Sequence, residues 1–441
     1  MTNMIAALGR VKQQLPELLS EEFVNSLARQ VGLRWRERVL SPVVMVHLLI
    51  LQVLHNNTAY AHLPRASGLS FTAAAFCKAK KKLPLTLLAK LIESVWQRCN
   101  QTVDSTRYCG HRTFYTDGSS ASMPDTSLLQ DRYGQPSGPK PGCGFPVVKL
   151  LMLFDAATGM IRQVLINAYR SHELPLVHQF HGLLQKGDLL IADRGFFSYV
   201  HLASLTQRGI HGLIRLHQRI GAGFDPADAQ LGAMRRVRVR ILGPGDQWVM
   251  YRKPKRRPDW MDQDTYDRLP QELVLRELRY HLDRRGFRTH RVTLVTTLLD
   301  PELYPASELA ELYGHRWRVE TNFRHLKTTL KMAVLHGKSP KMVETELLAY
   351  VLVYNLVQLV IHEAARRQGV PPERISFVDA VRWILSARPG DPWPILLVNP
   401  LRPERFEPRV RKRRHNGYSY MTRPRAELKA LLARGEDIKC R

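Results

Sequence analysis

The segment 312–331 constrains the fold of this chain more than any other, because its side chains repeat with the period of an α-helix. At ~100° per residue its apolar residues share an arc about 60° wide. These are Leu312, Val319, Phe323, Leu326 and Leu330. A neighbouring arc of about 80° holds the polar set. This set comprises Tyr313, Arg316, Glu320, Arg324, Lys327 and Lys331. We predict one helix that buries its apolar face and places a single carboxylate among cations.

The net charge of the chain predicts a polyanionic partner. The 441 residues suffice for two or three domains, and 66 Lys and Arg against 39 Asp and Glu leave a formal charge of +27. Each phosphate that such a surface neutralises releases counterions, which favours binding. Nucleic acid is therefore the first candidate, ahead of an anionic membrane and of a basic enzyme with no such partner.

Cysteine usage and hydropathy predict a cytoplasmic chain. The five cysteines lack the close spacing of a zinc site and fit reduced thiols. The N-terminus has no secretory signal pattern. Residues 43–54 are too short to span a bilayer, and 347–361 carry Asn355 and Gln358. We therefore expect buried helices and no membrane partner.

Residues 1–105 are predicted to be helical. Pro42 is a typical first helical residue, and further helices are expected at 73–82 and 84–99. The helix at 73–82 ends in the basic run Lys78–Lys82. The region fits a DNA-binding module, or a helical bundle with a solvated charged face, and the pattern does not choose between them.

Residues 106–219 show an α/β pattern. Strands are predicted at 112–116, 147–154, 160–167, 189–192 and 210–216, with helices at 173–184 and 198–207. The second and third strands form a hairpin around the turn 156–159. This order predicts an α/β layer architecture.

Three further regions follow. Residues 220–296 are predicted to form a β-rich insertion with strands at 235–242, 247–253, 273–282 and 291–298. Helices resume at Ser307 and continue to about Gln368 within the region 297–370. The region 371–441 is basic and is expected to be loop-like from about residue 400, with the run 409–415.

Three carboxylates stand out as candidate metal ligands. Asp117 and Asp193 each follow a predicted strand, and Glu320 lies on the helix described first. Neighbouring parallel strands and a packed helix could bring them together, where they would repel each other unless cations bind. Oxygen ligands suit Mg²⁺ or Mn²⁺, and two such ions ~3.5–4 Å apart can activate one oxygen and stabilise another.

Each carboxylate also has an ordinary structural explanation. Asp117 could form a turn, Asp193 could cap a helix, and Glu320 could pair with Arg316 or Arg324 on a solvated face. Together, on a chain of +27, they favour a metal site. The chain has no phosphate-binding Gly-Lys-Ser or Gly-Lys-Thr loop and no Gly-x-Ser-x-Gly elbow, so ATP use and serine hydrolysis are not expected.

Three motifs resemble one known family. The spacing of Tyr313, Arg316, Glu320 and Lys327 resembles the tyrosine-arginine-glutamate-lysine signature of bacterial insertion-sequence DDE transposases of the insertion sequence 4 type. The segments Ala192–Phe196 and Thr116–Ser119 resemble the family's second and first aspartate motifs. The resemblance covers roughly residues 40–420.

The resemblance implies both a fold and a site. It implies a ribonuclease H-like mixed sheet flanked by helices, interrupted by a β-rich insertion, after an N-terminal helical DNA-binding region. It implies that two Mg²⁺ ions, or Mn²⁺ in their place, bind Asp117, Asp193 and Glu320. The residues expected to bind DNA are Tyr313, Arg316, Lys327, Arg324 and Arg194. A tryptophan of the insertion, Trp248 or Trp260, could stack on a flipped base.

We therefore expect a Mg²⁺-dependent transposase. It would cut double-stranded DNA at the terminal inverted repeats and join the freed 3′-hydroxyl to target DNA as a homodimer, without ATP. Two alternatives remain: a ribonuclease H-like nuclease without strand transfer, and a catalytically inactive DNA-binding repressor.

Overall fold

A computed structural model describes most of the chain. The described residues are 18–102, 108–136, 142–217, 220, 223–224, 236–281, 291–386, 395–401 and 421–435. The basic run 409–415 and the N-terminal residues 1–17 lie outside them.

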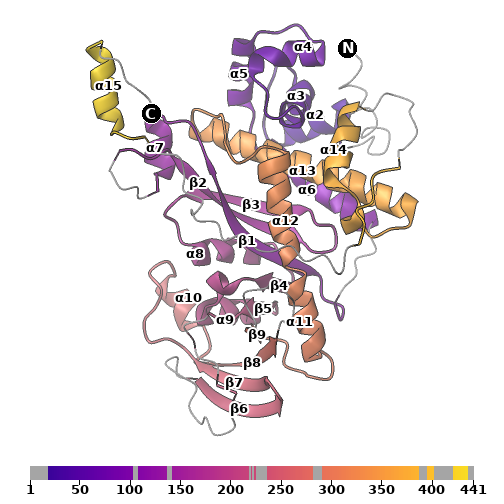
Figure 1. The fold of residues 1–441 in the computed structure, drawn as a ribbon, viewed down its shortest axis with the longest axis vertical. Helices are drawn as coiled ribbons and strands as arrows, with labels where there is room; N and C mark the ends of the chain where they lie inside the picture. Colours follow the sequence, from indigo (N-terminus) through magenta and orange to yellow (C-terminus); the bar gives the residue numbers. More distant parts are fainter. Residues whose placement is uncertain are drawn as a thin grey trace.

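A nine-stranded mixed sheet runs through the molecule (Figure 1). Its strands are β1 (Thr113–Ser122), β2 (Val147–Asp155), β3 (Ile161–Ala168), β4 (Leu189–Ala192), β5 (His211–Arg215), β6 (Arg236–Gly243), β7 (Asp246–Arg252), β8 (Glu272–His281) and β9 (Arg291–Thr296). They lie in the order β3-β2-β1-β4-β5-β9-β8-β7-β6. Among the pairs of described strands, β1–β4 and β4–β5 are parallel and the others are antiparallel. The predicted mixed α/β fold is confirmed.

The predicted β-rich insertion continues the same sheet. β9 pairs with β5 in antiparallel register, with Leu213 opposite Thr296, and β8, β7 and β6 follow outward. Figure 1 shows these strands at the end of the molecule away from the N-terminal helices. The insertion therefore extends a sheet edge that β5 would otherwise leave unpaired.

The first strand is longer than predicted. We expected it to end at Thr116, but β1 continues to Ser122, so Asp117 lies within the strand opposite Met152 of β2. The small residues after Asp117 fit a strand here because nine consecutive residues of β2 pair with it. Backbone pairing outweighs the turn preference of the Asp-Gly-Ser sequence.

The N-terminal region is helical, as predicted. Its helices are α2 (Glu21–Gln30), α3 (Pro42–Leu54), α4 (Leu63–Ser67), α5 (Ala73–Lys82) and α6 (Leu85–Thr102), with the short 3₁₀ turn η1 (Tyr60–His62). The side chains of Ser20 and Thr72 cap α2 and α5. Within the basic run, Lys80 is fully buried, and its Nζ lies 3.3 Å from the Tyr60 hydroxyl. Lys78, Lys81 and Lys82 are exposed.

The long helix α13 (Pro340–Gln368) packs against α3, α6 and β3 and joins the N-terminal helices to the sheet. It is long and apolar enough to cross a membrane, yet 83% of its most apolar window is buried inside the protein. The predicted burial of 347–361 is thus confirmed, since a core helix of this kind is apolar all round.

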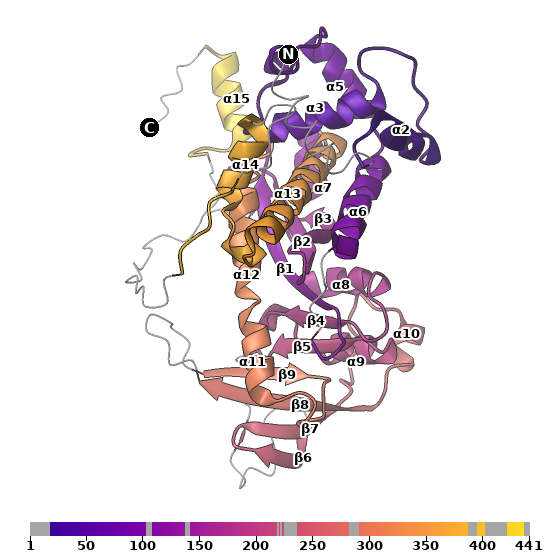
Figure 2. The same ribbon diagram turned by 90° about the vertical axis from the view of Figure 1, so that its right-hand side faces the viewer.

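The remaining elements surround the sheet. They are α7 (Ser127–Tyr133), α8 (Glu173–Val177), η2 (His178–Gly182), η3 (Arg194–Phe196), α9 (Tyr199–Gln207), α10 (Gln263–Asp267), α11 (Ala306–Gly314), α12 (Trp317–Arg324), the π-turn η5 (His325–Thr329), η6 (Pro372–Arg374), α14 (Phe377–Ser386) and α15 (Arg425–Ala433). In Figure 2, α11 and α12 lie on one side of the sheet, and α8 and α9 lie on the other. The predicted helix 173–184 is instead the short α8 followed by a 3₁₀ turn, and α15 interrupts the tail expected to be a loop.

The segment 312–331 is not one α-helix. α11 ends at Gly314, α12 begins at Trp317, and the wider turn η5 follows it. Glycine is the least helix-favouring residue after proline, which favours a break there. The apolar side is nevertheless buried as predicted, at Val319, Phe323, Leu326 and Leu330.

Candidate active site

The register of two parallel strands places the two candidate aspartates side by side. Thr116 of β1 pairs with Ala192 at the end of β4, and Asp117 and Asp193 are the next residues of their chains. Asp117 does not form a turn, because it continues in β1. Asp193 occupies the position before η3, but its side chain makes no capping hydrogen bond there. Their proximity agrees with the arrangement predicted for neighbouring parallel strands.

The signature segment contacts both aspartates. Nη1 of Arg316 donates to Oδ2 of Asp117 at 3.1 Å, and Nη2 lies 3.9 Å from Oε1 of Glu320. The Tyr313 hydroxyl lies 3.4 Å from Oδ1 of Asp193. Tyr313, in α11, and Arg316, between the two helices, thus contact the strands, and α12 carries Glu320. All three predicted carboxylates thus meet at one network.

Burial dominates the electrostatics of this network. Desolvation raises the pKa of Asp117 to about 6, although Arg316 and the backbone N–H of Gly118 favour its charged form. The nearby carboxylates of Asp193 and Glu173 raise the pKa further. Burial also raises the pKa of the Tyr313 phenol, so this phenol stays protonated and can donate.

Arg316 is the cation at the centre of the network. Burial opposes its charge, but Tyr313, Asp193 and Asp117 raise its pKa. It is only 7% exposed, and its Nε has no hydrogen-bond partner among the described residues. One guanidinium therefore lies among the carboxylates of Asp117, Asp193 and Glu320.

The donor set suits a hard divalent cation in chemistry, although its present geometry is not that of a bound ion. Carboxylate oxygens are the ligands that Mg²⁺ and Mn²⁺ prefer. Within the described part of the chain, no three acidic, histidine or cysteine side chains are close enough to share a metal ion. Arg316 lies between Asp117 and Glu320, and the Glu320 side chain is 51% exposed. A divalent ion there would compete with Arg316 for the same carboxylate oxygens.

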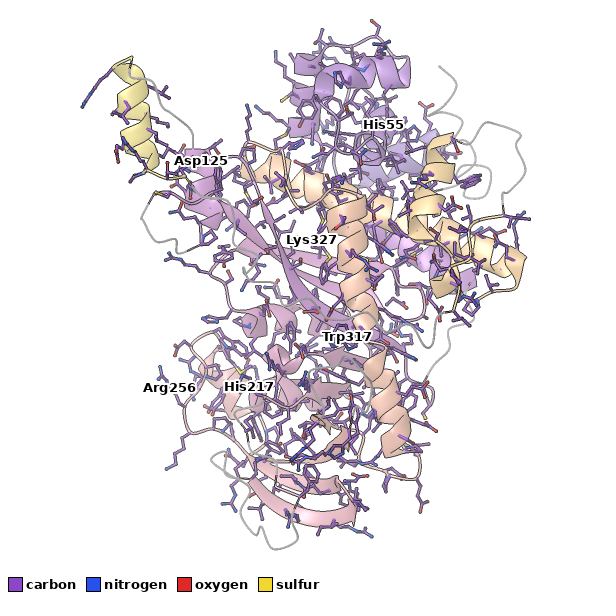
Figure 3. All side chains as sticks on the ribbon, viewed as in Figure 1. His55, Asp125, His217, Arg256, Trp317 and Lys327 are labelled. Carbon is purple, nitrogen blue, oxygen red and sulfur yellow. The ribbon has the colours of Figure 1, made fainter. Side chains whose placement is uncertain are left out.

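The other predicted DNA-binding residues differ in exposure. Arg324 is exposed, whereas Arg194 and Lys327 are half-buried, and burial lowers the pKa of Lys327. Figure 3 shows Trp317 and Lys327 along the α12–η5 segment beside the sheet. The contacts of Arg324, Arg194 and Lys327 with DNA stay predictions.

The two tryptophans of the insertion are both half-buried. Nε1 of Trp248 donates to the carbonyl of Leu299 at 2.9 Å, and Trp260 packs on the His178 ring with centroids 4.5 Å apart. Neither contact selects one of them for base stacking.

Glu173 is a residue of this site that its sequence pattern did not single out. We predicted that it begins an amphipathic helix, but its carboxylate lies over the backbone of both aspartate motifs, at Gly118 and Gly195. The signal in the sequence was weak: an acidic residue at the start of a helix after a strand, with a glycine after each aspartate.

The fold and the carboxylate network define a class of protein. Carboxylates on two parallel strands and a helix, beside cations on a strongly basic chain, are typical of enzymes that act on the phosphodiesters of nucleic acid. The comparisons with known proteins give the family. The family model described as "Transposase DDE domain" matches residues 108–356, and the chain belongs to this family.

Two curated relatives agree with this assignment. The chain is 25% identical over 374 residues to the transposase InsG for insertion sequence element IS4 of Escherichia coli (strain K12), covering 80% of this chain and 78% of that protein. It is 21% identical over 375 residues to the probable transposase for insertion sequence element IS5377 of Geobacillus stearothermophilus, covering 82% and 88%. The protein is an insertion-sequence DDE transposase, a metal-dependent enzyme of DNA transposition.

The chain also aligns with a solved structure. The cryo-EM structure of the piggyBac transposase synaptic complex with hairpin DNA aligns over 86% of this chain and 79% of that chain, with 12% identity and a TM-score of 0.43.

Proposed function

We propose that residues 106–219 and 297–370 form a ribonuclease H-like catalytic core. Support comes from the sheet, in which three antiparallel strands, β3-β2-β1, are followed by β4 and β5 parallel to β1. The strands of 220–296 enter between β5 and α11 and extend this sheet. Residues 1–105 form the N-terminal DNA-binding region of the proposal, and the basic region 371–441 completes the chain.

The catalytic carboxylates of the proposal are Asp117, Asp193 and Glu320. The observation that carries it is the pairing of Thr116 with Ala192, which places the two aspartates together under the Arg316 that also reaches Glu320. These residues would hold two Mg²⁺ ions, for which Mn²⁺ can substitute. When bound, the ions would stabilise negative charge on the attacking and leaving oxygens of a phosphodiester.

The residues of the signature segment have two roles in this proposal. Tyr313 and Arg316 are buried against the aspartates and orient them, and their contact with DNA phosphates requires that they release these partners. Lys327 and Arg324, with Arg194 beside Asp193, neutralise the phosphates of the bound end.

The reaction consists of phosphoryl transfers at one site. Water attacks the phosphodiester at each element end and leaves a 3′-hydroxyl, and this hydroxyl then attacks target DNA. No ATP is required, because each step either hydrolyses a phosphodiester bond or exchanges one phosphodiester bond for another. Two copies hold the two terminal inverted repeats, so the working form is a homodimer on double-stranded DNA in the bacterial cytoplasm.

The test is the variant Asp117→Asn on a duplex that carries the element's own terminal repeat. Cleavage should fall by about a thousandfold, which corresponds to ~4 kcal/mol of transition-state stabilisation, while end binding persists. Asp131→Asn, at an exposed aspartate of α7, is the matched control. Cleavage that persists in Asp117→Asn would overturn the assignment.

A pre-cut end separates the remaining alternatives. A transposase joins this end to target DNA, whereas a nuclease of the same fold only hydrolyses DNA. A repressor binds the end but neither joins nor hydrolyses DNA, and the wild type and Asp117→Asn then behave alike.

A further inference from the structure

We propose that Glu173 supports the divalent-cation site from outside the set of ligands, by adding negative charge beside Asp117 and Asp193 that strengthens cation binding. The proposal rests on the proposed role of these two aspartates. Glu173 is the first residue of α8, and α8 packs against β2 and the η3 turn that follows Asp193.

The position of the Glu173 carboxylate is defined by two glycines. A Cβ atom built on Gly118, directly after Asp117, would lie 2.5 Å from Oε1 of Glu173. A Cβ atom on Gly195, two residues after Asp193, would lie 3.8 Å from Oε2. The carboxylate thus lies over the backbone of both aspartate motifs at once.

The glycine at position 118 is explained by the volume that the Glu173 carboxylate occupies beside it, and its backbone conformation does not explain it. Gly118 lies in β1 and does not adopt a left-handed φ, so its conformation is open to any residue. The three atoms nearest to a Cβ built there all belong to the carboxylate of Glu173. The glycine therefore permits Glu173 to approach the strand next to Asp117.

Glu173 approaches from the face of β1 opposite to Arg316. Successive side chains of a strand point to opposite faces, so Gly118 faces away from Asp117 and its partner Arg316. Thr116 shares the face of Gly118, and its fully buried hydroxyl has no hydrogen-bond partner among the described residues. Glu173 therefore acts through its charge and need not contact the ion. Residues that surround the ligands of a metal commonly act in this way.

The charge of Glu173 is only partly balanced. Nζ of Lys149 lies 3.9 Å from Oε1, but the same ammonium donates to the Ser171 carbonyl at 2.6 Å. The Glu173 carboxylate lies over Gly118, the residue after Asp117, and two like charges this close repel each other. A divalent ion near Asp117 would relieve this repulsion, and for this reason the negative charge favours cation binding.

The experiment measures Mn²⁺ affinity by calorimetry on the full chain without DNA. Glu173→Gln keeps the shape of the side chain and removes its charge, and it should weaken Mn²⁺ binding by about tenfold. Gly118→Ala should weaken binding in the same direction, because the new methyl group pushes the flexible carboxylate away. Glu93→Gln is the matched control, since Glu93 also pairs with a strand residue, Arg162, at 2.9 Å.

The outcomes separate this inference from the proposed function. Weaker binding in Glu173→Gln and Gly118→Ala, with Glu93→Gln unchanged, supports the inference. If Asp117→Asn abolishes Mn²⁺ binding while Glu173→Gln matches the wild type, the role of Glu173 is wrong and the proposed function stands. If Asp117→Asn binds Mn²⁺ normally, the proposed function itself fails.

Discussion

The guanidinium of Arg316 donates a 3.1 Å hydrogen bond to Asp117, a residue 199 positions earlier in the chain. The same guanidinium reaches Glu320 one helical turn further on. A single side chain thus joins strand β1 to helix α12 and supplies positive charge where the proposed cation would bind. This relationship makes protein stability a readout of the site.

Removing Arg316 should make the stability of the protein depend more strongly on divalent cations. Arg316→Ala leaves the largely buried Asp117 without its ion-pair partner and should cost about 2 kcal/mol of unfolding free energy with chelator present. Saturating Mn²⁺ should recover part of this loss, because the ion no longer competes with the guanidinium. Thermal denaturation with and without Mn²⁺ measures both effects.

The control is the neighbouring exposed pair. Arg318 contacts Glu373 at 3.0 Å with both side chains well exposed, so Arg318→Ala should cost under about 1 kcal/mol and show no extra response to Mn²⁺. If Arg316→Ala loses the same unfolding free energy with and without Mn²⁺, the guanidinium and the cation do not share one position.

The stability gained by Asp117→Asn should depend on pH. The pKa of Asp117 rises from 3.8 to about 6 on folding. Its protonated form therefore contributes stability that is fully present below pH 3.8 and lost as the pH rises through 6. Asparagine is neutral throughout, so the variant should gain up to about 3 kcal/mol over the wild type at pH 7.5 and little at pH 4.

Urea denaturation in chelator at the two pH values measures this difference. Asp131→Asn, at the exposed aspartate of α7, should change little between them. A gain for Asp117→Asn that is the same at both pH values would show that desolvation of the charge is not its cause.

Lys327→Ala should weaken binding to the terminal repeat and flatten its salt dependence. One lost phosphate contact reduces the slope of log K against log salt by about 1. Fluorescence anisotropy over a salt series provides the slope. Lys186→Ala is a suitable comparison. Lys186 is exposed, and it precedes β4, at the opposite end of this strand from Asp193. An unchanged slope for Lys327→Ala would argue against phosphate contact.

Glu346 should be essential for holding the N-terminal helices against the core. Its buried carboxylate accepts from Asn57 at 2.6 Å and from the backbone N–H groups of His336 and Gly337. Glu346→Gln replaces one acceptor oxygen by a donor and should cost about 3 kcal/mol in urea denaturation. Glu363→Gln, further along the same helix, should cost under about 1 kcal/mol, because Glu363 pairs there with the exposed Arg366. Similar losses in the two variants would rule out this role.

Local patterns predicted most elements of the sheet. The alternation and apolar runs placed β2, β3, β4 and β5 within a residue or two, because burial of a strand depends on its own side chains. They placed the strands of the insertion as well. They did not predict that β9 pairs with β5 and joins all nine strands in one sheet, since pairing across sequence depends on which edge is left open.

The helix of the signature motif shows the limit of periodicity. The period of 3.6 residues correctly predicted which side is buried, but it concealed the break between Gly314 and Trp317. Burial of Tyr313 and Arg316 against the aspartates accompanies the break, and these long-range contacts leave no mark on the local pattern.

By itself, the sequence determined the chemistry that was available: a basic chain, aspartates after strands, a glutamate on an amphipathic helix, and a resemblance to DDE transposases. These are local properties of residue type and spacing. Only the tertiary structure decided that Thr116 lies beside Ala192, that Arg316 occupies the space between carboxylates, and that Glu173 reaches Gly118. Such contacts arise from the packing of segments far apart in the chain, where the geometry of the whole sheet sets each distance.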